Sequence, residues 1–311
     1  MRILHLIYSL NVGGAERMVI TLANYQVQSN QVGLCIINNL YSQKLLNELD
    51  SRIQVFRINR KKASRNILDV FQLNRYVFKF RPDILHIHDS DAILYIPIRS
   101  FYHTILTIHA MNLPLKGYKL YNQTVAISKA VADNTENRGL CRPEVIYNGI
   151  STSAIQRTKK NIPNAEQNFR IVQVGRLEHG IKGQHLILKA LHRLSSSHIS
   201  IDFIGDGSSY NYLKEVPRQL KLEKQVNFLG NCDIEWIYHH LCDYHLLVQP
   251  SISEGFGLTI AEGMAAEVPV LVSDLPAPLE IIDKGKQGYY FRHNDVDDLC
   301  RMLRYIIKHY E

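Results

Sequence analysis

The sequence predicts an α/β protein made of two doubly wound parallel sheets, each in its own domain. Three observations lead to this expectation. Short apolar runs alternate with longer segments of helical periodicity, and the series occurs twice along the chain. A polar stretch at 151–168, which lacks periodicity and contains Pro163, separates the two series. The 311 residues, 46% of them hydrophobic, suffice for two buried cores.

The first half begins with an apolar run that ends before a glycine pair. Several of its runs are almost unbroken Val, Ile and Leu, as in strands that are buried on both faces of a parallel sheet. Strands are predicted at 3–8, 33–37, 54–58, 84–88, 104–108, 124–127 and 144–147, with helices at 15–28 and 67–80. Strand–helix alternation implies right-handed crossovers and therefore parallel pairing.

The second half repeats the pattern. Strands are predicted at 170–174, 201–204, 226–229, 245–249 and 270–273, with helices at 183–194, 209–220, 259–266 and 296–309. We therefore expect domains at 1–150 and 169–311 and a linker at 151–168. The carboxyl ends of the strands should face a cleft between the domains, because open α/β sheets bind ligands there.

Charge is spread unevenly over a chain whose formal net charge is +7. Residues 1–165 hold 21 basic and 10 acidic residues, whereas 166–311 hold 15 and 19. Within 51–81 there are nine basic residues and one acid, Asp69. A basic half suggests an anionic surface or ligand. We expect no nucleic-acid partner, because no recognised binding module or stacking pattern accompanies the charge.

Three other classes of protein are excluded. No apolar window approaches the roughly 18 residues of a membrane span. The apolar start is interrupted at 11–14, so we interpret it as the first strand of a cytoplasmic protein rather than a signal peptide. The five cysteines are odd in number, widely spaced and without C-x-x-C, which indicates reduced thiols instead of disulfides or zinc.

The first candidate motif is the loop that contains Gly13 and Gly14, directly after the first strand. Two glycines let backbone N–H groups approach an anion, and the next helix presents its positive end. The motif is neither G-x-G-x-x-G nor a P-loop. A tight turn without ligand is the alternative interpretation.

The second candidate is Arg176 with Lys182, six residues apart in a loop that leads to a helix at Gly183. A guanidinium, an ammonium and a helix N-terminus suit a diphosphate. A solvated surface pair is the alternative.

The third candidate joins two glutamates, Glu254 in a glycine-rich loop and Glu262 about one turn inside the following helix. Gly255 and Gly257 again allow a ligand close to the backbone. A carboxylate there can accept hydrogen bonds from the vicinal hydroxyls of a sugar or ribose. The alternative is a helix cap and a solvated helix residue.

In combination these motifs resemble the retaining nucleotide-sugar glycosyltransferases of the GT-B fold, glycosyltransferase family 4 (glycosyl transferases group 1). The resemblance follows the chain in order at 13–17, 81–83, 107–109, 126–128, 145–150, 174–176, 182–183, 204–207, 228–230, 250–251 and 254–262. It implies two Rossmann-like domains that face a cleft, the N-terminal one on the acceptor side and the C-terminal one binding the nucleotide sugar.

The resemblance also implies residue roles. It makes His109 and Glu254 the catalytic residues, with Glu254 positioning the sugar rather than attacking it. The implied donor-binding residues are Gly13, Gly14, Arg176, Lys182, Gly255, Phe256, Gly257, Leu258 and Glu262. Among these, Arg176 and Lys182 would hold the diphosphate, Glu262 the ribose, and the loop at 228–233 would lie near the base. Glu16 and Arg17 have a structural interpretation as well.

The implied chemistry needs no cofactor and no metal. The cations neutralise the leaving diphosphate, and front-side attack would give retention. Asp89-Ser90-Asp91 spells D-x-D, but it follows a first-domain strand and we interpret it as a loop. His86 and His88 share a strand face; no third metal ligand is evident beside them, so we expect packing or cleft polarity.

The basic stretch at 52–81 has two open interpretations. It includes Arg60, Lys61, Lys62 and Arg65, followed by the aromatic residues Phe71, Tyr76, Phe78 and Phe80. It could hold the protein against anionic lipid on the inner face of the plasma membrane, near a lipid-linked acceptor. Alternatively, it is a solvated helix whose aromatics pack on the sheet.

Three departures from the family pattern concern the acceptor side and the linker. Only 15 residues separate His109 from Val125, where the resemblance implies several tens. No crossover segment follows the helix predicted at 296–309, and Ser151 replaces a common Asp.

We therefore expect a retaining, metal-independent transferase that moves a hexose or N-acetylhexosamine from a UDP-sugar to a growing glycan. Bacterial surface-polysaccharide or lipopolysaccharide synthesis is the expected setting. The alternatives are a nucleotide-sugar epimerase on the same fold and a non-catalytic sugar-nucleotide-binding partner of a transferase.

Overall fold

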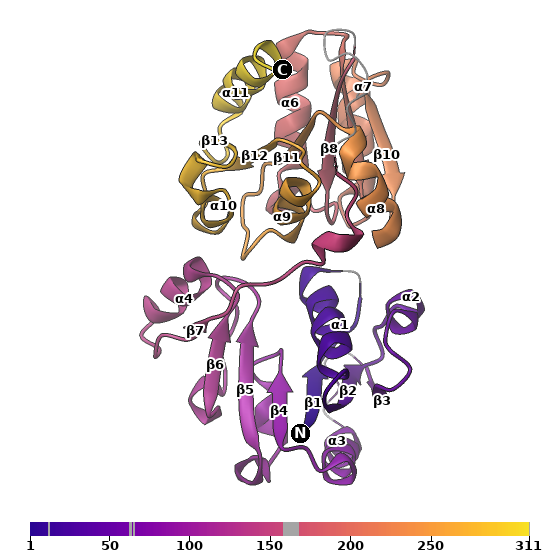
Figure 1. Cartoon of the computed structure of the whole chain (residues 1–311), viewed down its shortest axis with the longest axis vertical. Helices are drawn as coiled ribbons and strands as arrows, with labels where there is room; N and C mark the ends of the chain where they lie inside the picture. Colours follow the sequence, from indigo (N-terminus) through magenta and orange to yellow (C-terminus); the bar gives the residue numbers. More distant parts are fainter. Residues whose placement is uncertain (12, 62–63, 65, 158–167, 311) are drawn as a thin grey trace. The chain divides into compact units, whose positions relative to one another are not determined.

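The computed structural model describes residues 1–11, 13–61, 64, 66–157 and 168–310. Most of the predicted linker at 151–168, together with Lys62 and Arg65 of the basic stretch, lies outside the described residues. The chain divides into two compact units, Met1–Asn148 and Gly149–Glu311. Each unit is a parallel sheet with helices around it, which confirms the predicted fold class (Figure 1).

The N-terminal unit contains a seven-stranded sheet in the order β3-β2-β1-β4-β5-β6-β7. All of its strand pairs are parallel. The strands are β1 (Arg2–Ile7), β2 (Gln31–Asn38), β3 (Gln54–Arg60), β4 (Ile84–Ile87), β5 (His103–Ile108), β6 (Gln123–Ala126) and β7 (Glu144–Val145). The strand order reverses between β1 and β4, so their carboxyl ends mark the topological switch point of this sheet.

Four α-helices and three 3-10 turns belong to the described part of this unit. They are α1 (Gly14–Gln26), α2 (Gln43–Asn47), α3 (Ile67–Phe80), α4 (Lys129–Glu136), η1 (Ala92–Tyr95), η2 (Arg99–Phe101) and η3 (Tyr118–Leu120). Helix α3 begins where the Asn66 side chain accepts a hydrogen bond from the Leu68 N–H, at 3.1 Å. It ends at Arg81, whose left-handed conformation stops the helical hydrogen bonding.

The C-terminal unit contains a six-stranded sheet in the order β10-β9-β8-β11-β12-β13. Its strands are β8 (Phe169–Val174), β9 (Ile199–Ile204), β10 (Val226–Gly230), β11 (Leu246–Gln249), β12 (Val270–Ser273) and β13 (Tyr289–Phe291). Its helices are α5 (His179–Lys182), α6 (Gln184–Leu194), α7 (Tyr210–Leu220), α8 (Ile234–His240), α9 (Leu258–Ala265), α10 (Pro276–Ile281) and α11 (Val296–Lys308), with 3-10 turns η4 (Thr152–Ala154), η5 (Leu241–Asp243) and η6 (Asp283–Gly285). Here the order reverses between β8 and β11.

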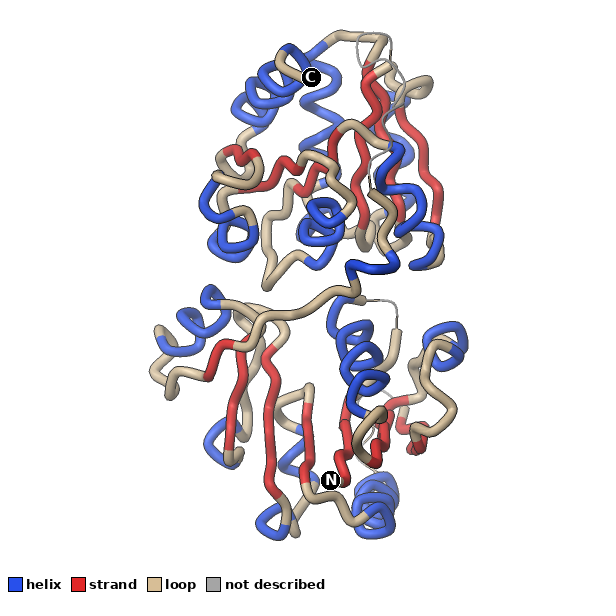
Figure 2. The backbone as a smooth tube through the Cα atoms, viewed as in Figure 1, coloured by secondary structure: helices blue, strands red, loops and turns tan. Residues whose placement is uncertain are grey.

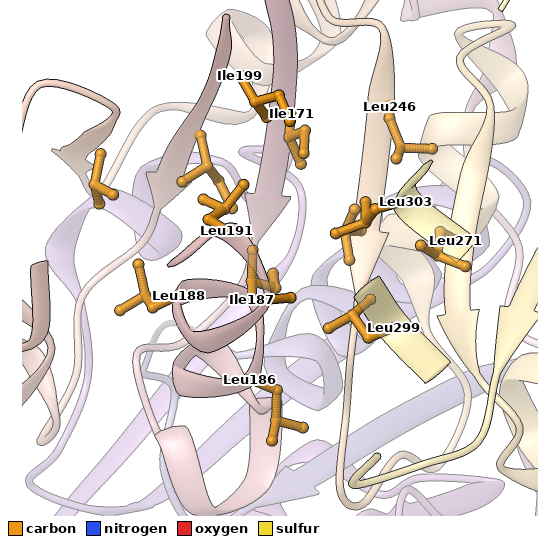
Figure 3. Close-up of a cluster of buried hydrophobic side chains, with 14 of the residues drawn as sticks. Ile171, Leu186, Ile187, Leu188, Leu191, Ile199, Leu246, Leu271, Leu299 and Leu303 are labelled. Carbon is orange, nitrogen blue, oxygen red and sulfur yellow. The ribbon is translucent and has the colours of Figure 1, made fainter. Parts of the chain in front are cut away.

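Helices cover both faces of the C-terminal sheet (Figure 2). Successive residues of β8 enter different clusters: Ile171 packs with α6 and α11, whereas Val172 packs with α8, α9 and α10. Figure 3 shows the first cluster, in which Leu191 of α6 and Leu303 of α11 lie against the strands. Burial on both faces explains why these strands appear in the sequence as continuous apolar runs.

The helices of the described chain are also too short or too polar to cross a lipid bilayer.

Gly205, directly after β9, is a backbone position that the fold requires to be glycine. Its φ is +136°, and a Cβ there would collide with the carbonyl oxygen of Gly175, at the end of the neighbouring strand β8. Because the colliding atom belongs to the backbone, a side-chain rotation cannot relieve the contact.

We predict that Gly205→Ala lowers the free energy of unfolding of the C-terminal unit by about 3 kcal/mol or more, because it adds a collision to backbone strain. Gly230→Ala is the matched control, since Gly230 has φ +70° and open space around its Cβ position. Strain alone should cost the control about 1 kcal/mol. Urea unfolding of the full chain measures both, and equal losses would contradict the assignment.

Candidate functional site

The loop after β8 depends on a close approach between two backbone segments. Gly183 ends helix α5 with φ +69°, and a Cβ there would collide with the carbonyl oxygen of Pro250. Ile181 adds a second link, because its carbonyl accepts the N–H groups of Ile252 and Ser253 at 2.8 and 3.2 Å. The loops that follow β8 and β11 are therefore held together at the switch point of the sheet.

This approach brings two predicted site residues into direct contact. Lys182 Nζ lies 2.7 Å from Glu254 Oε2, and the two side chains are only 19% and 11% exposed. Ser251 Oγ donates to the same oxygen at 3.1 Å. Removal of either charge would leave the other largely buried without its counter-ion, which is costly. Glu254 is thus one half of a largely buried ion pair.

The pair leaves donor capacity for a ligand. An ammonium carries three N–H donors, and the bond to Glu254 uses one of them. Helix α6 begins directly after the Lys182 loop, and its first N–H groups lie at the same end of the sheet. This arrangement can bind phosphate oxygens on one side and orient a hydroxyl with the carboxylate on the other.

Arg176 has different surroundings. Its side chain is 55% exposed, and its Nη1 lies 3.5 Å from Glu178 Oε1. The loop backbone is fixed instead by Gln184, whose Nε2 donates to the Arg176 carbonyl at 2.9 Å. The sequence pattern alone does not indicate Glu178 as the partner of Arg176.

Glu262 lies in α9 and is only 5% exposed, so it is not the solvated helix residue of the alternative interpretation. The hydroxyl of Tyr238, from α8, lies 3.5 Å from its Oε1. Helix α9 starts at Leu258 after Gly257, whose φ of +109° makes the sharp turn out of the loop. Phe256 is buried beside Gly255.

The glycine loop of the N-terminal unit leads straight into a helix. Gly13 has extended backbone and Gly14 is the first residue of α1, while Val12 lies outside the described residues. Arg17 Nη1 lies 3.4 Å from Glu48 Oε2, a contact between α1 and the residue after α2. This pair supports the structural interpretation of Arg17.

His109 belongs to a cluster of imidazoles at the carboxyl ends of β1, β4 and β5. Its Nε2 lies 2.9 Å from Nδ1 of His88. The rings of His86 and His88 stack at 4.5 Å, as expected for two residues on one strand face. His5 of β1 is paired directly with His86 of β4, and its Nδ1 lies 3.1 Å from His88 Nε2.

His5 is a third imidazole beside His86 and His88. The expectation from the sequence that no third potential metal ligand lies there was wrong. One ring nitrogen from each of the three lies within 4.8 Å of the others. The sequence could not show this proximity, because it depends on β1 and β4 being neighbours across more than seventy intervening residues.

Burial keeps the cluster neutral. It lowers the pKa of His5 and of His109 to about 4 and that of His86 and His88 well below the ordinary value. Beside the cluster, Asp89 Oδ2 accepts the Tyr8 N–H at 2.6 Å. Burial raises the pKa of Asp89 to about 6. The Asp89 carboxylate, in the loop after β4, thus binds the backbone N–H of Tyr8.

We predict that acidification destabilises the N-terminal unit through these histidines. The unfolded chain binds protons below about pH 6.5 while the folded cluster stays neutral, so stability falls as pH is lowered toward 4. Between pH 7 and pH 5, each of these buried histidines lowers the free energy of unfolding by about 2 kcal/mol. Protonation of Asp89 in the folded state raises it by about 1 kcal/mol.

His86→Gln should reduce this pH dependence by about 2 kcal/mol in urea unfolding at the two pH values. His103→Gln, a change at an exposed histidine of β5, is the control and should leave it unaltered. The same pH dependence in both variants would contradict the prediction.

Comparisons with known proteins match both units. Residues 154–311 match the family model of glycosyl transferases group 1, and residues 12–154 match the model described as Glycosyltransferase Family 4. An uncharacterized glycosyltransferase of Methanocaldococcus jannaschii is 27% identical over 62% of this chain and 52% of its own length. The lipopolysaccharide 1,6-galactosyltransferase of Salmonella typhimurium is 25% identical over 59% and 52%. The chain thus spans about half the length of these curated relatives.

Two solved structures are similar over 99% of this chain and 90% of theirs. Anabaena HepE in complex with UDP and glucose has a TM-score of 0.84 at 21% identity. Sucrose-phosphate synthase from Thermosynechococcus elongatus has a TM-score of 0.82 at 13% identity. At these identities the likeness shows a shared fold.

Proposed function

Since the chain belongs to the glycosyl transferases group 1 family and has the GT-B fold, we propose that it transfers a hexose or N-acetylhexosamine, with retention, from a UDP-sugar to a growing glycan. The UDP and glucose bound to HepE support the choice of donor. The lipopolysaccharide galactosyltransferase and an O-antigen chain mannosyltransferase, both of Salmonella typhimurium, support an acceptor in surface-polysaccharide synthesis.

The observation that carries this proposal is the Lys182–Glu254 pair. It lies where the loops after β8 and β11 meet, at the switch point at which doubly wound sheets bind ligands. A cation for phosphate and a carboxylate for hydroxyls stand side by side there. That combination suits a sugar attached to a diphosphate.

In the proposed reaction, Lys182 and Arg176 stabilise the negative charge that develops on the diphosphate as the bond from its oxygen to sugar C1 breaks. The leaving oxygen keeps the bonding electron pair. The acceptor hydroxyl oxygen forms the new bond to C1 from the same face, and its proton passes to the leaving phosphate. Glu254, with the backbone of Gly255 to Leu258, orients the sugar hydroxyls, and Glu262 holds the ribose.

This assignment gives the charge neutralisation to protein cations and to the N-terminus of α6, so we propose that catalysis is independent of metal and cofactor. We assign His109, Gly13 and Gly14 of the N-terminal unit to the same reaction on their motif positions. Gly13 and Gly14 present the start of α1 to an anion, and His109 presents an imidazole.

We predict that Lys182→Met lowers kcat for UDP release by about a hundredfold or more, because one fixed positive charge is lost from the leaving diphosphate. Lys189→Met, which removes an exposed lysine of α6 in the same unit, should retain wild-type turnover. The assay measures UDP release from a panel of UDP-sugars with lipid-linked acceptor glycans. Equal turnover in the two variants would refute the site.

Further measurements test retention and metal independence and distinguish the transferase from the alternative functions. Retention predicts that the product keeps the donor's anomeric configuration in the proton NMR spectrum, and a chelator should leave the rate unchanged. Conversion of the donor without acceptor would instead identify an epimerase. UDP binding without turnover on every acceptor would favour a non-catalytic partner subunit.

Helix α3 supports the proposed attachment to anionic lipid. Its exposed side chains are apolar or basic: Ile67, Leu68, Phe71, Arg75, Phe78 and Lys79. Exposed fractions are 69% for Phe71 and 64% for Phe78. Tyr76 and Phe80, in contrast, pack on the sheet, so the packing interpretation describes only these two aromatics. A face that combines aromatic and basic residues is typical of interfacial helices.

A shallow hollow at the end of α3 adds a site for a headgroup. Its lining consists of one aromatic and four cationic side chains: Arg2, Arg75, Phe78, Lys79 and Arg81. Arg81 also lies over the Phe78 ring, with its Cζ 5.9 Å from the centroid. Clustered cations beside an exposed aromatic suit a lipid phosphate at the membrane surface.

We predict that Phe71→Ser combined with Phe78→Ser weakens binding to phosphatidylglycerol–phosphatidylethanolamine vesicles by at least about tenfold, because two apolar anchors are lost. Phe101→Ser, at an 80% exposed residue outside α3, is the control and should bind like wild type. Vesicle flotation measures binding. Equal binding to phosphatidylcholine vesicles, or no loss in the double variant, would contradict this attachment.

A further inference from the structure

A line of hydrogen bonds crosses the histidine cluster and ends at His109. It starts at Gln26, the last residue of α1, whose Oε1 lies 2.8 Å from His5 Nε2. His5 Nδ1 then lies 3.1 Å from His88 Nε2, and His88 Nδ1 lies 2.9 Å from His109 Nε2. His5 lies in β1, and His88 and His109 directly follow the neighbouring strands β4 and β5, so the line runs across three adjacent strands.

The protons along this line have one consistent placement. An amide oxygen only accepts, so His5 Nε2 must carry the proton and donate to Gln26. A neutral imidazole has one N–H, so His5 Nδ1 accepts and His88 Nε2 donates. The same reasoning makes His88 Nδ1 an acceptor and His109 Nε2 a donor. His109 Nδ1 is left with its lone pair.

The last nitrogen of the line, His109 Nδ1, can still accept a hydrogen bond. His109 Nδ1 is buried and has no hydrogen-bond partner among the residues that the structure describes. A buried polar atom of this kind is costly unless a ligand completes it. Burial also lowers the pKa of His5 and His109 to about 4, which keeps both rings neutral near pH 7.

We propose that Gln26, His5 and His88 are positioning residues that fix the tautomer of His109, so that its Nδ1 accepts a hydrogen bond from a hydroxyl of the substrate. This inference rests on the proposed transferase function. It also narrows the role of His109, because a lone pair repels phosphate oxygens and attracts an O–H group. His109 therefore recognises a sugar hydroxyl, and the phosphates are left to Lys182 and Arg176.

The same cluster is less suited to a metal ion. A ligand nitrogen needs a free lone pair, but both ring nitrogens of His5 and of His88 already have hydrogen-bond partners. His86 Nε2 is likewise within 2.7 Å of Thr107 Oγ1. Metal binding would have to break the line at two of its residues.

The direct test is NMR of the full chain with ¹⁵N-labelled histidine, using two-bond nitrogen–proton correlations that report which ring nitrogen carries the proton. The expected result is Nε2–H and bare Nδ1 at His5, His88 and His109. The opposite tautomer at His109 would overturn the proposal. So would replacement of these signals by metal-bound ones when Zn²⁺ alone is added in stoichiometric amount.

A variant at the far end of the line provides the second test. Gln26→Met keeps the side-chain length but removes the acceptor that sets the direction of the bonds, so His109 should show a mixture of tautomers. Gln28→Met changes an exposed glutamine two residues away and is the control. In the transferase assay, Gln26→Met should lower kcat/KM for the nucleotide sugar about tenfold, the value of one hydrogen bond.

These readouts test the transferase function and the positioning role separately. If the wild-type protein shows the expected tautomers but transfers no sugar, the proposed function fails while the line of hydrogen bonds stands. If wild type turns over and Gln26→Met changes neither the tautomer of His109 nor kcat/KM, the positioning role fails while the transferase function stands.

Discussion

The ion pair between Lys182 and Glu254 is the contact on which the rest of the C-terminal unit depends. It requires the loops after β8 and β11 to approach until their backbones touch, which only a glycine at position 183 permits. Parallel pairing of β8 with β11 places both loops at one edge of the sheet. The cores on the two faces of that sheet hold the strands rigid, so a few side chains stay fixed for ligand binding.

Much of this arrangement could be predicted from the sequence, because strands buried on both faces appear as apolar runs and sharp turns appear as glycines. Short elements escaped prediction: α2, α4, α5, α8, α10 and β13 have few residues and therefore little periodicity. Side-chain contacts that depend on strand order or on the path of a loop could not be predicted either. His5 faces His86 only because β1 and β4 are neighbours, and the pairing of Arg176 with Glu178 depends on the path of one loop.

The boundary between the two units changes the charge that is assigned to each half of the chain. Residues 1–148 hold 18 basic and 10 acidic residues, whereas 149–311 hold 18 and 19. The acidic excess seen in the second half of the sequence therefore shrinks, because the basic residues at 157, 159 and 160 belong to the second unit. The proposed phosphate binding would then depend on individually placed cations such as Lys182, while the positive excess of the first unit is concentrated at 51–81.

The most direct test of the proposed donor site is a crystal structure of the full chain with UDP bound. We predict that a β-phosphate oxygen lies within hydrogen-bond distance of Lys182 Nζ while this nitrogen keeps its bond to Glu254, and that the ribose lies at Glu262. A diphosphate bound elsewhere on the C-terminal unit, with the Lys182–Glu254 pair unaltered and solvent beside it, would contradict the proposed donor site.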